Sequence, residues 1–243
     1  GWAPLGSVFL VSGVIALFAE LLILGLGRPR RGLNIVPLMG SLGLLIVTLW
    51  VSVIGWTEPR GVLAVAAVQG NLDQRIKWQT HQFDANFDRH WQPTLGLSEA
   101  DLVVWPEASF TDFRKNRTEL LRAMDAVVSE RGQGLIIGLP DRNENGYTNT
   151  ALGLGEVDGS YAKRHLVPFG EYVPLEQWLR GVITFFDLPM SRNQPGPQRQ
   201  TPLSFKGQPL SLSICYEIAY PHLVRSAATQ PMALVTISND TWF

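Results

Sequence analysis

Two long apolar runs open the chain. Residues 5–26 carry one charge, Glu20, and residues 33–56 carry none. An α-helix needs about 20 apolar residues to cross the hydrocarbon core of a bilayer, and each run has that length. Buried core helices and a cleaved signal peptide are the alternatives, but two successive runs without a basic start fit neither. The pattern predicts two transmembrane helices within residues 1–58, joined by residues 27–32.

The short connection between these helices is rich in arginine. Arg28, Arg30 and Arg31 lie in it, and an excess of basic residues in a short loop marks the cytoplasmic side of a membrane. Trp50 and Trp56 lie near the far end of the second run, and tryptophan is enriched at membrane interfaces. We therefore expect the first helix to run inward, the second to run outward, and the rest of the chain to lie outside the cytoplasm.

A different pattern begins at about residue 59. Short β-favouring apolar runs follow, of the kind found in buried strands: 62–68, 102–105, 135–139, 211–214 and 233–237. Helical spacing separates them, most clearly at Leu120, Leu121, Met124, Val127 and Val128. Strands that alternate with helices predict an α/β domain with a central sheet across residues 59–243. Residues 71–92 and 185–201 show neither pattern and are predicted to be long loops, which compact domains usually keep for function.

One further segment, residues 178–190, is crowded with large apolar side chains. Trp178, Phe185 and Phe186 are among them. We interpret the segment as a lid that contacts lipid at the membrane surface, because large exposed apolar patches mark such contacts. An insertion that packs into the core is the alternative.

Composition and charge exclude some classes of function. The 243 residues include 20 basic and 21 acidic side chains, which gives a formal net charge of −1 and no polybasic tract of the kind that binds nucleic acid. The single cysteine, Cys215, allows no disulfide within the chain. The four histidines and this cysteine lack metal-ligand spacing, so we expect no metal site.

The lone cysteine lies where a strand is predicted to give way to a helix. Cys215 follows the apolar run 211–214 and precedes Tyr216, Glu217 and Ile218, where helical spacing begins. Such a corner exposes a side chain and provides free backbone N–H groups, which bind an oxyanion and lower the pKa of a thiol. A buried, chemically inert cysteine is the alternative interpretation.

Two charged residues occupy comparable places. Glu107 ends the apolar run that begins at Leu102, and ligands gather at the carboxyl ends of strands in α/β sheets. A carboxylate beside Trp105 in an apolar setting has a raised pKa and can act as a general base, although an acid that caps a helix is the alternative. Lys163 precedes a turn that contains Pro and Gly. Its charge can hold a thiolate or an oxyanion, and a solvated lysine is the ordinary case.

Glu107, Lys163 and Cys215, in this chain order on an α/β pattern, resemble the Glu-Lys-Cys triad of the carbon–nitrogen hydrolase, or nitrilase, superfamily. Four segments are similar to those of one membrane-bound family within it, the apolipoprotein N-acyltransferases: 105–107, 161–171, 215–217 and 238–243. The resemblance covers residues 61–243 and implies a nitrilase-type αββα sandwich after the two transmembrane helices. That family has more helices before this point and continues past it, so we expect a longer protein whose catalytic domain is truncated here at its C-terminus.

The resemblance also implies an activity. The family moves an acyl chain from a phospholipid to the α-amino group of the N-terminal diacylglyceryl-cysteine of an apolipoprotein, at the periplasmic side of the bacterial inner membrane. In this chain Cys215 would form a thioester and Glu107 would carry the proton. Lys163 and the backbone N–H of Tyr216 would hold the oxyanion. No metal or organic cofactor is implied.

The same resemblance assigns supporting or substrate-binding roles to four more residues: Glu171, Tyr216, Glu217 and Trp78. A surface acid is the alternative for Glu171, and a packing anchor is the alternative for Trp78. Two other functions stay open. One is a membrane-tethered amidase or nitrilase that hydrolyses small amides, and the other is a lipoprotein-binding protein with an inactive triad.

Overall fold

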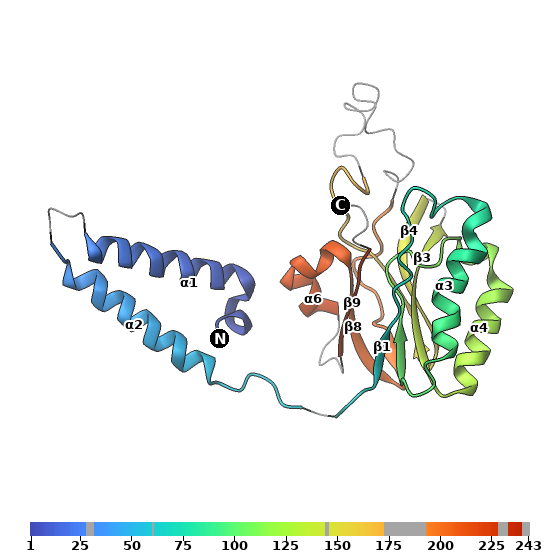
Figure 1. Ribbon diagram of the computed structural model, residues 1–243, viewed down its shortest axis with the longest axis horizontal. Coiled ribbons are helices and arrows are strands. Elements are labelled where there is room, and N and C mark those ends of the chain that lie inside the picture. The colour runs from blue at the N-terminus through green and yellow to red at the C-terminus, as the bar shows by residue number, and fades with distance from the viewer. Residues whose placement is uncertain (28–31, 60, 144–145, 173–192, 228–232, 240–243) are drawn as a thin grey trace, which may run out of the picture. The chain divides into compact units, whose positions relative to one another are not determined.

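The computed structural model describes residues 1–27, 32–59, 61–143, 146–172, 193–227 and 233–239 (Figure 1). It divides into two units, Gly1–Val62 and Leu63–Phe243. The first unit holds a pair of helices, and the second holds two β-sheets together with shorter helices.

The first unit consists of two apolar helices, α1 (Ala3–Leu26) and α2 (Ile35–Ser52). Their mean hydropathies are 2.5 and 2.0, and both are long and apolar enough to cross a membrane. The indole N–H of Trp2 donates to the hydroxyl of Thr48 at 3.0 Å, which joins the two helices near one end of the pair. The helices expected from the two apolar runs are therefore present.

Five strands form the first sheet of the second unit, in the order β1-β2-β3-β4-β6. They are β1 (Val65–Ala67), β2 (Leu102–Val104), β3 (Gly134–Asn143), β4 (Gly146–Gly155) and β6 (Ser160–Ala162). β1, β2 and β3 are parallel, so their carboxyl ends meet at one edge of the sheet, whereas β4 pairs antiparallel with both β3 and β6. The three parallel strands coincide with predicted apolar runs.

Four strands form the second sheet, in the order β5-β7-β8-β9. They are β5 (Val157–Asp158), β7 (Ser204–Phe205), β8 (Gln208–Ile214) and β9 (Ala233–Ile237). β8 and β9 run parallel with Ile214 opposite Ile237, so these two strands also end together.

The hydrophobic core lies in two layers, one on each face of the first sheet. Along β3, Leu135 and Ile137 belong to the layer shared with α3 (Phe83–Leu95) and α4 (Thr118–Glu130), while Ile136 belongs to the layer between the two sheets. This alternation is typical of a strand buried on both faces. Figure 1 shows α3 and α4 beside the first sheet and α6 (Pro221–Ala227) on the far side, next to β8 and β9. The expected αββα arrangement is confirmed.

The prediction of a long loop at residues 71–92 was wrong in its second half. A 3₁₀ turn, η1 (Thr80–Gln82), leads directly into α3. Phe83, Phe87 and Trp91 recur every four residues and stack against one another, with ring centroids 6.1 and 5.9 Å apart. This apolar face packs on the sheet and stabilises a helix whose other positions are polar.

Some predicted features fall outside the described residues. They are the arginines used to orient the helices, Arg28, Arg30 and Arg31, and the side chains of the expected lid, Trp178, Phe185 and Phe186. Of the predicted loop 185–201, residues 193–201 are described and contain no helix or named strand.

Candidate active site

Three of the predicted site residues directly follow strands. Glu107 follows β2, Lys163 follows β6, and Cys215 follows β8. The Lys163 Nζ lies 3.3 Å from Glu107 Oε1 and 2.8 Å from Oε2 of Glu171. The structure therefore places one buried ammonium group between two carboxylates.

A tight turn after β2 fixes the position of Glu107. Ala108 adopts a positive φ of 51°, and Phe110 N–H donates to the Gly138 carbonyl of β3 at 2.9 Å. The turn approaches β3 so closely that a Cβ on Gly138 would lie 2.7 Å from the Glu107 Cα. Only glycine allows this approach, because a real Cβ essentially never comes so near another heavy atom.

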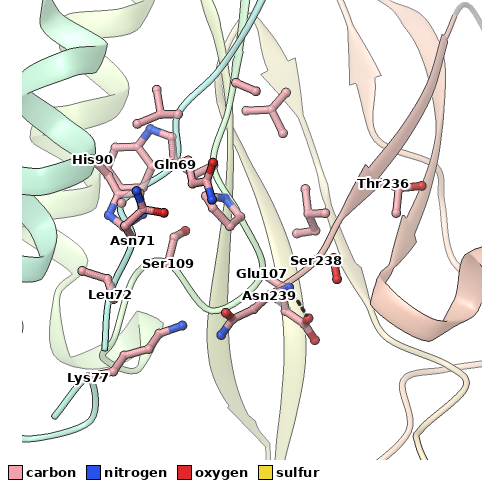
Figure 2. Close-up of a pocket in the computed structure, with 17 residues that line it drawn as sticks. Gln69, Asn71, Leu72, Lys77, His90, Glu107, Ser109, Thr236, Ser238 and Asn239 are labelled. Atoms are coloured by element: carbon pink, nitrogen blue, oxygen red, sulfur yellow. Dashed lines mark hydrogen bonds between the residues drawn. The ribbon is translucent and has the colours of Figure 1, made fainter. Parts of the chain in front are cut away.

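The Glu107 carboxylate is 6% exposed and has a partner at each oxygen. The side-chain amide of Asn149 on β4 and the Lys163 ammonium both donate to Oε1. The backbone N–H of Asn239, just after β9, donates to Oε2 at 3.1 Å, as the dashed line in Figure 2 shows. These partners fix the orientation of the carboxylate.

Lys163 is 1% exposed, so its charge depends on its two neighbours. Burial alone lowers the pKa of the ammonium, but the charges of Glu107 and Glu171 outweigh burial and raise the pKa above its ordinary value. Glu171 also accepts the backbone N–H of Val167 at 2.9 Å, which holds the carboxylate in place. Lys163 is thus a fixed cation at neutral pH.

Cys215 begins a 3₁₀ turn, η5 (Cys215–Ala219), directly after β8. Its φ is +53°, an uncommon conformation for a residue with a Cβ and one that recurs at functional sites. Burial and then the charge of Glu107 raise the pKa of the thiol, against lowering by Ser238, by Lys163 and by the N–H of Tyr216. The group therefore rests as a thiol, and its use as a nucleophile requires a base.

Glu217, in the same turn, is completely buried and connects the strands that carry Cys215 and Lys163. Its carboxylate accepts the N–H of Ile214 at 2.9 Å and the N–H of Arg164 at 2.7 Å. Since these two residues adjoin Cys215 and Lys163, one side chain sets the spacing of both. Glu217 is therefore a positioning residue, because these hydrogen bonds go to the backbone and not to the Cys215 thiol.

Comparisons with known proteins identify the family of this chain. The sequence model of the carbon-nitrogen hydrolase family matches residues 64–243. The chain belongs to this family.

Solved structures with the same fold include an amidase from Nesterenkonia sp. AN1, which is 23% identical to this chain. The aligned region covers 73% of this chain and 67% of the amidase, and the TM-score is 0.50. A CN-hydrolase superfamily protein from Xanthomonas campestris is 20% identical, with coverages of 73% and 64% and a TM-score of 0.50. Both show the same fold.

Curated relatives narrow the resemblance within the carbon-nitrogen hydrolase family. The apolipoprotein N-acyltransferase of Pseudomonas syringae pv. tomato is 40% identical over all of this chain, which covers 49% of that protein. The apolipoprotein N-acyltransferase of Coxiella burnetii is 31% identical over all of this chain, which covers 51% of it. The chain thus spans about half the length of these curated relatives.

Two predicted supporting residues lie at the surface of this carbon-nitrogen hydrolase domain. Tyr216 is 40% exposed, and its ring lies 5.1 Å from Tyr220 and 6.0 Å from His165 between centroids. Trp78 is 39% exposed, and its ring centroid lies 5.7 Å from the Lys77 Nζ. Tyr216 adjoins Cys215 in the chain, and Trp78 adjoins Lys77.

A cavity of about 470 Å³ opens beside Glu107. The loop after β1, the turn after β2, the segment after β9, Lys77 and His90 enclose it (Figure 2). Cys215 and Lys163 are not among its lining residues. Ser238 connects the cavity with the nucleophile, because it lines the cavity and forms a hydrogen bond with the Cys215 thiol.

Sequence reasoning missed three residues of this region: Lys77, Asn149 and Asn239. Asn239 belongs to the segment 238–243 that carried the family resemblance, so a signal for it was present. Asn149 lies on a strand that the apolar pattern did not reveal, and its role depends on long-range pairing. Lys77 looks like an ordinary solvated lysine in the sequence, but it is 3% exposed.

Proposed function

We propose that this protein transfers an acyl chain from a phospholipid to the α-amino group of an N-terminal diacylglyceryl-cysteine of apolipoproteins. The observation that carries the chemistry is the buried Glu107–Lys163 pair, whose charges both act on the Cys215 thiol. The acceptor and donor are inferred from the name of the curated relatives, which match this chain along its whole length.

In the first half-reaction Glu107 takes the thiol proton as the Sγ of Cys215 attacks the ester carbonyl carbon of the phospholipid. The negative charge that develops on the carbonyl oxygen is held by Lys163 and by the Tyr216 backbone N–H. When the carbon–oxygen bond breaks, Glu107 returns the proton to the leaving alkoxide. Lysophospholipid departs and a thioester remains on Cys215.

In the second half-reaction the free amino group of the acceptor attacks the thioester carbon. Glu107 accepts a proton from the attacking nitrogen, and the carbon–sulfur bond breaks to leave an amide and a thiolate. The proton then passes to the Cys215 sulfur and regenerates the thiol. The two substrates use one nucleophile in turn, so the scheme is ping-pong, and no step calls for a cofactor.

The supporting residues keep this geometry. Glu171 shares the Lys163 ammonium with Glu107, and Glu217 sets the spacing of the two strand ends. Tyr216 supplies its backbone N–H to the oxyanion, and Trp78 lies beside Lys77, which lines the cavity. The expected lid around Trp178, Phe185 and Phe186 remains part of the proposal as a contact with the acyl chains.

The proposed function also implies where the protein and its catalytic domain lie in the cell. α1 and α2 would span the bacterial inner membrane with the catalytic domain on the periplasmic side, where phospholipid and lipoprotein are both within reach. Arg28, Arg30 and Arg31 support this orientation by the rule that basic loops stay in the cytoplasm.

A transfer assay tests the function. The intact protein in detergent micelles is mixed with phosphatidylethanolamine and a synthetic diacylglyceryl-cysteine peptide, and the peptide is analysed by mass spectrometry. We expect a gain of one acyl group with the wild type and none with Cys215→Ala. Hydrolysis of small free amides without any acyl gain on the peptide would instead indicate a membrane-tethered amidase.

A further inference from the structure

Lys77 presents a buried amino group to the cavity beside Glu107. The side chain is 3% exposed, and its backbone carbonyl accepts the amide of Asn86 at 2.9 Å, which fixes the residue in place. Figure 2 shows the amino group pointing from its loop across the cavity toward the side on which Glu107 and Asn239 lie. The backbone of Lys77 is therefore anchored, and its amino group faces the cavity.

Within the part of the chain that the structure describes, the Lys77 ammonium has no hydrogen bond or ion pair. The Lys77 Nζ lies 5.7 Å from the centroid of the Trp78 ring. Glu107 acts on it through space, but Lys163, Asn149 and the Asn239 N–H already occupy that carboxylate. Burial lowers the pKa of the Lys77 ammonium to about 8, while the charge of Glu107 opposes that shift, so the amino group is still largely protonated near neutral pH. A buried cation without a paired anion is costly, and an anionic ligand in the cavity would stabilise it.

We propose that the cavity is the subsite for the phosphate of the acyl donor's headgroup, with Lys77 as its cationic ligand. The proposal rests on the function proposed above and adds the residue that recognises the donor.

The location of the cavity fits the shape of a glycerophospholipid. In such a lipid the glycerol backbone separates the phosphate from the ester carbonyls, so a phosphate subsite must adjoin the nucleophile without containing it. Ser238 lines the cavity and hydrogen-bonds the Cys215 thiol, and Glu107 borders both places. A lipid with its ester carbonyl at Cys215 can thus place its phosphate beside Lys77.

The other lining groups suit a polar headgroup. Asn71 and Gln69 line the cavity and carry side-chain amide donors, which can bind phosphate and headgroup oxygens, and Ser109 lines the cavity as well. Ser109 itself is 2% exposed and donates to the Gly138 carbonyl at 3.2 Å, so its position is fixed by β3. The volume of about 470 Å³ lies in the usual range for small-ligand sites.

The first test compares two acyl donors that differ in phosphate. Phosphatidylethanolamine and p-nitrophenyl palmitate are given to the intact wild type, to Lys77→Met and to Lys115→Met, whose lysine is exposed in the 3₁₀ turn η2 (Arg114–Asn116). Acylation of Cys215 is followed by intact mass. We expect Lys77→Met to raise the half-saturating phospholipid concentration about tenfold to a hundredfold, because a charge-assisted hydrogen bond is lost.

With p-nitrophenyl palmitate, Lys77→Met should keep the wild-type half-saturating concentration and maximal rate. Lys115→Met should keep the wild-type values of both quantities with phospholipid and with the ester. An equal loss with both donors would overturn the proposal, because Lys77 would then serve the chemistry or the fold. Unchanged kinetics with both donors would also overturn it. If the wild type reacted with the ester but never with phospholipid, the proposed function would fail. The second test would then show whether the cavity still binds a phosphate headgroup.

The second test needs no variant. Glycerophosphoethanolamine, a headgroup without acyl chains, should inhibit acylation of the wild type by the ester, and inorganic phosphate at the same concentration should inhibit at least tenfold less. Equal inhibition by the two anions would show that the cavity binds anions in general, and it would overturn the headgroup assignment. No inhibition by either would show that the cavity does not bind phosphate at all.

Discussion

At the scale of single residues, burial and the charge of Glu107 together hold the Cys215 thiol protonated, and Glu107 is also the group proposed to deprotonate it. Burial and the charge of Glu107 raise the pKa of Cys215, and the rate of reaction with a neutral alkylating reagent depends on the thiolate. We expect iodoacetamide labelling of the wild type to rise with pH along a curve centred above the ordinary value for cysteine. A midpoint below that value would contradict the account of the thiol.

Glu107→Gln should change labelling and catalysis in opposite directions. Loss of the negative charge lowers the pKa of the thiol, so the variant should be alkylated faster than the wild type at pH 8. Loss of the base should slow acylation by phospholipid about 10²- to 10⁴-fold. Glu130→Gln, an exposed acid at the end of α4, serves as the control and should change neither rate. Slower alkylation together with slower acylation would indicate a displaced turn rather than a lost base.

Glu217→Gln tests the positioning role of a residue away from the thiol. A neutral amide has only one acceptor oxygen, so the N–H groups of Ile214 and Arg164 cannot both keep their partner. A buried donor without an acceptor costs about 1–3 kcal/mol, and we expect a loss of stability of that size in denaturant unfolding. Acylation should slow with both phospholipid and a phosphate-free ester. Wild-type stability with a selective loss on phospholipid would assign Glu217 to substrate binding instead.

At the scale of elements, the site depends on how closely the turn after β2 approaches β3. Gly138→Ala would place a Cβ 2.5 Å from the Pro106 carbonyl and 2.7 Å from Glu107 Cα, so the turn must move. We expect at least a tenfold slower acylation and a stability loss of about 1–3 kcal/mol, as for other overpacked positions. Gly61→Ala is the matched control, since a Cβ there meets nothing within 4 Å. Equal behaviour of the two variants would mean that the turn is more pliable than its contacts indicate.

The elements also show what the sequence could reveal. Strands buried on both faces, such as β2 and β3, leave continuous apolar runs, and α4 leaves a clear helical stripe in Leu121, Met124 and Val128. α3 was missed because its aromatic stripe is narrow and polar residues surround it. β4 was missed because most of its residues are small or polar, and the strand is defined by its pairing with β3 along ten residues.

The candidate site was predictable only in part for the same reason. Glu107, Lys163 and Cys215 each follow a strand, and their order in the chain carried the family resemblance. The sharing of Lys163 by two carboxylates, the role of Asn149 and the burial of Lys77 depend on contacts between residues far apart in sequence. No local pattern encodes such contacts.

At the scale of the whole molecule, the orientation of the chain in the membrane is a prediction that depends on the arginine-rich connection. In a Cys215→Ala background, Lys115→Cys introduces one exposed thiol into the catalytic domain. A membrane-impermeant maleimide should label it in sealed right-side-out vesicles and fail to label it in sealed inverted vesicles. Arg30→Cys in the same background should show the reverse accessibility. Labelling of Lys115→Cys in inverted vesicles would place the domain in the cytoplasm.

The central claim is that Cys215 carries the acyl chain between two substrates. Intact-mass measurement of the purified protein after exposure to phosphatidylethanolamine, without acceptor, tests it most directly. The account predicts a mass increase of one acyl group that hydroxylamine removes, that a diacylglyceryl-cysteine peptide discharges, and that is absent from Cys215→Ala. A protein that transfers acyl groups without this adduct, or an adduct of the same mass on Cys215→Ala, would contradict it.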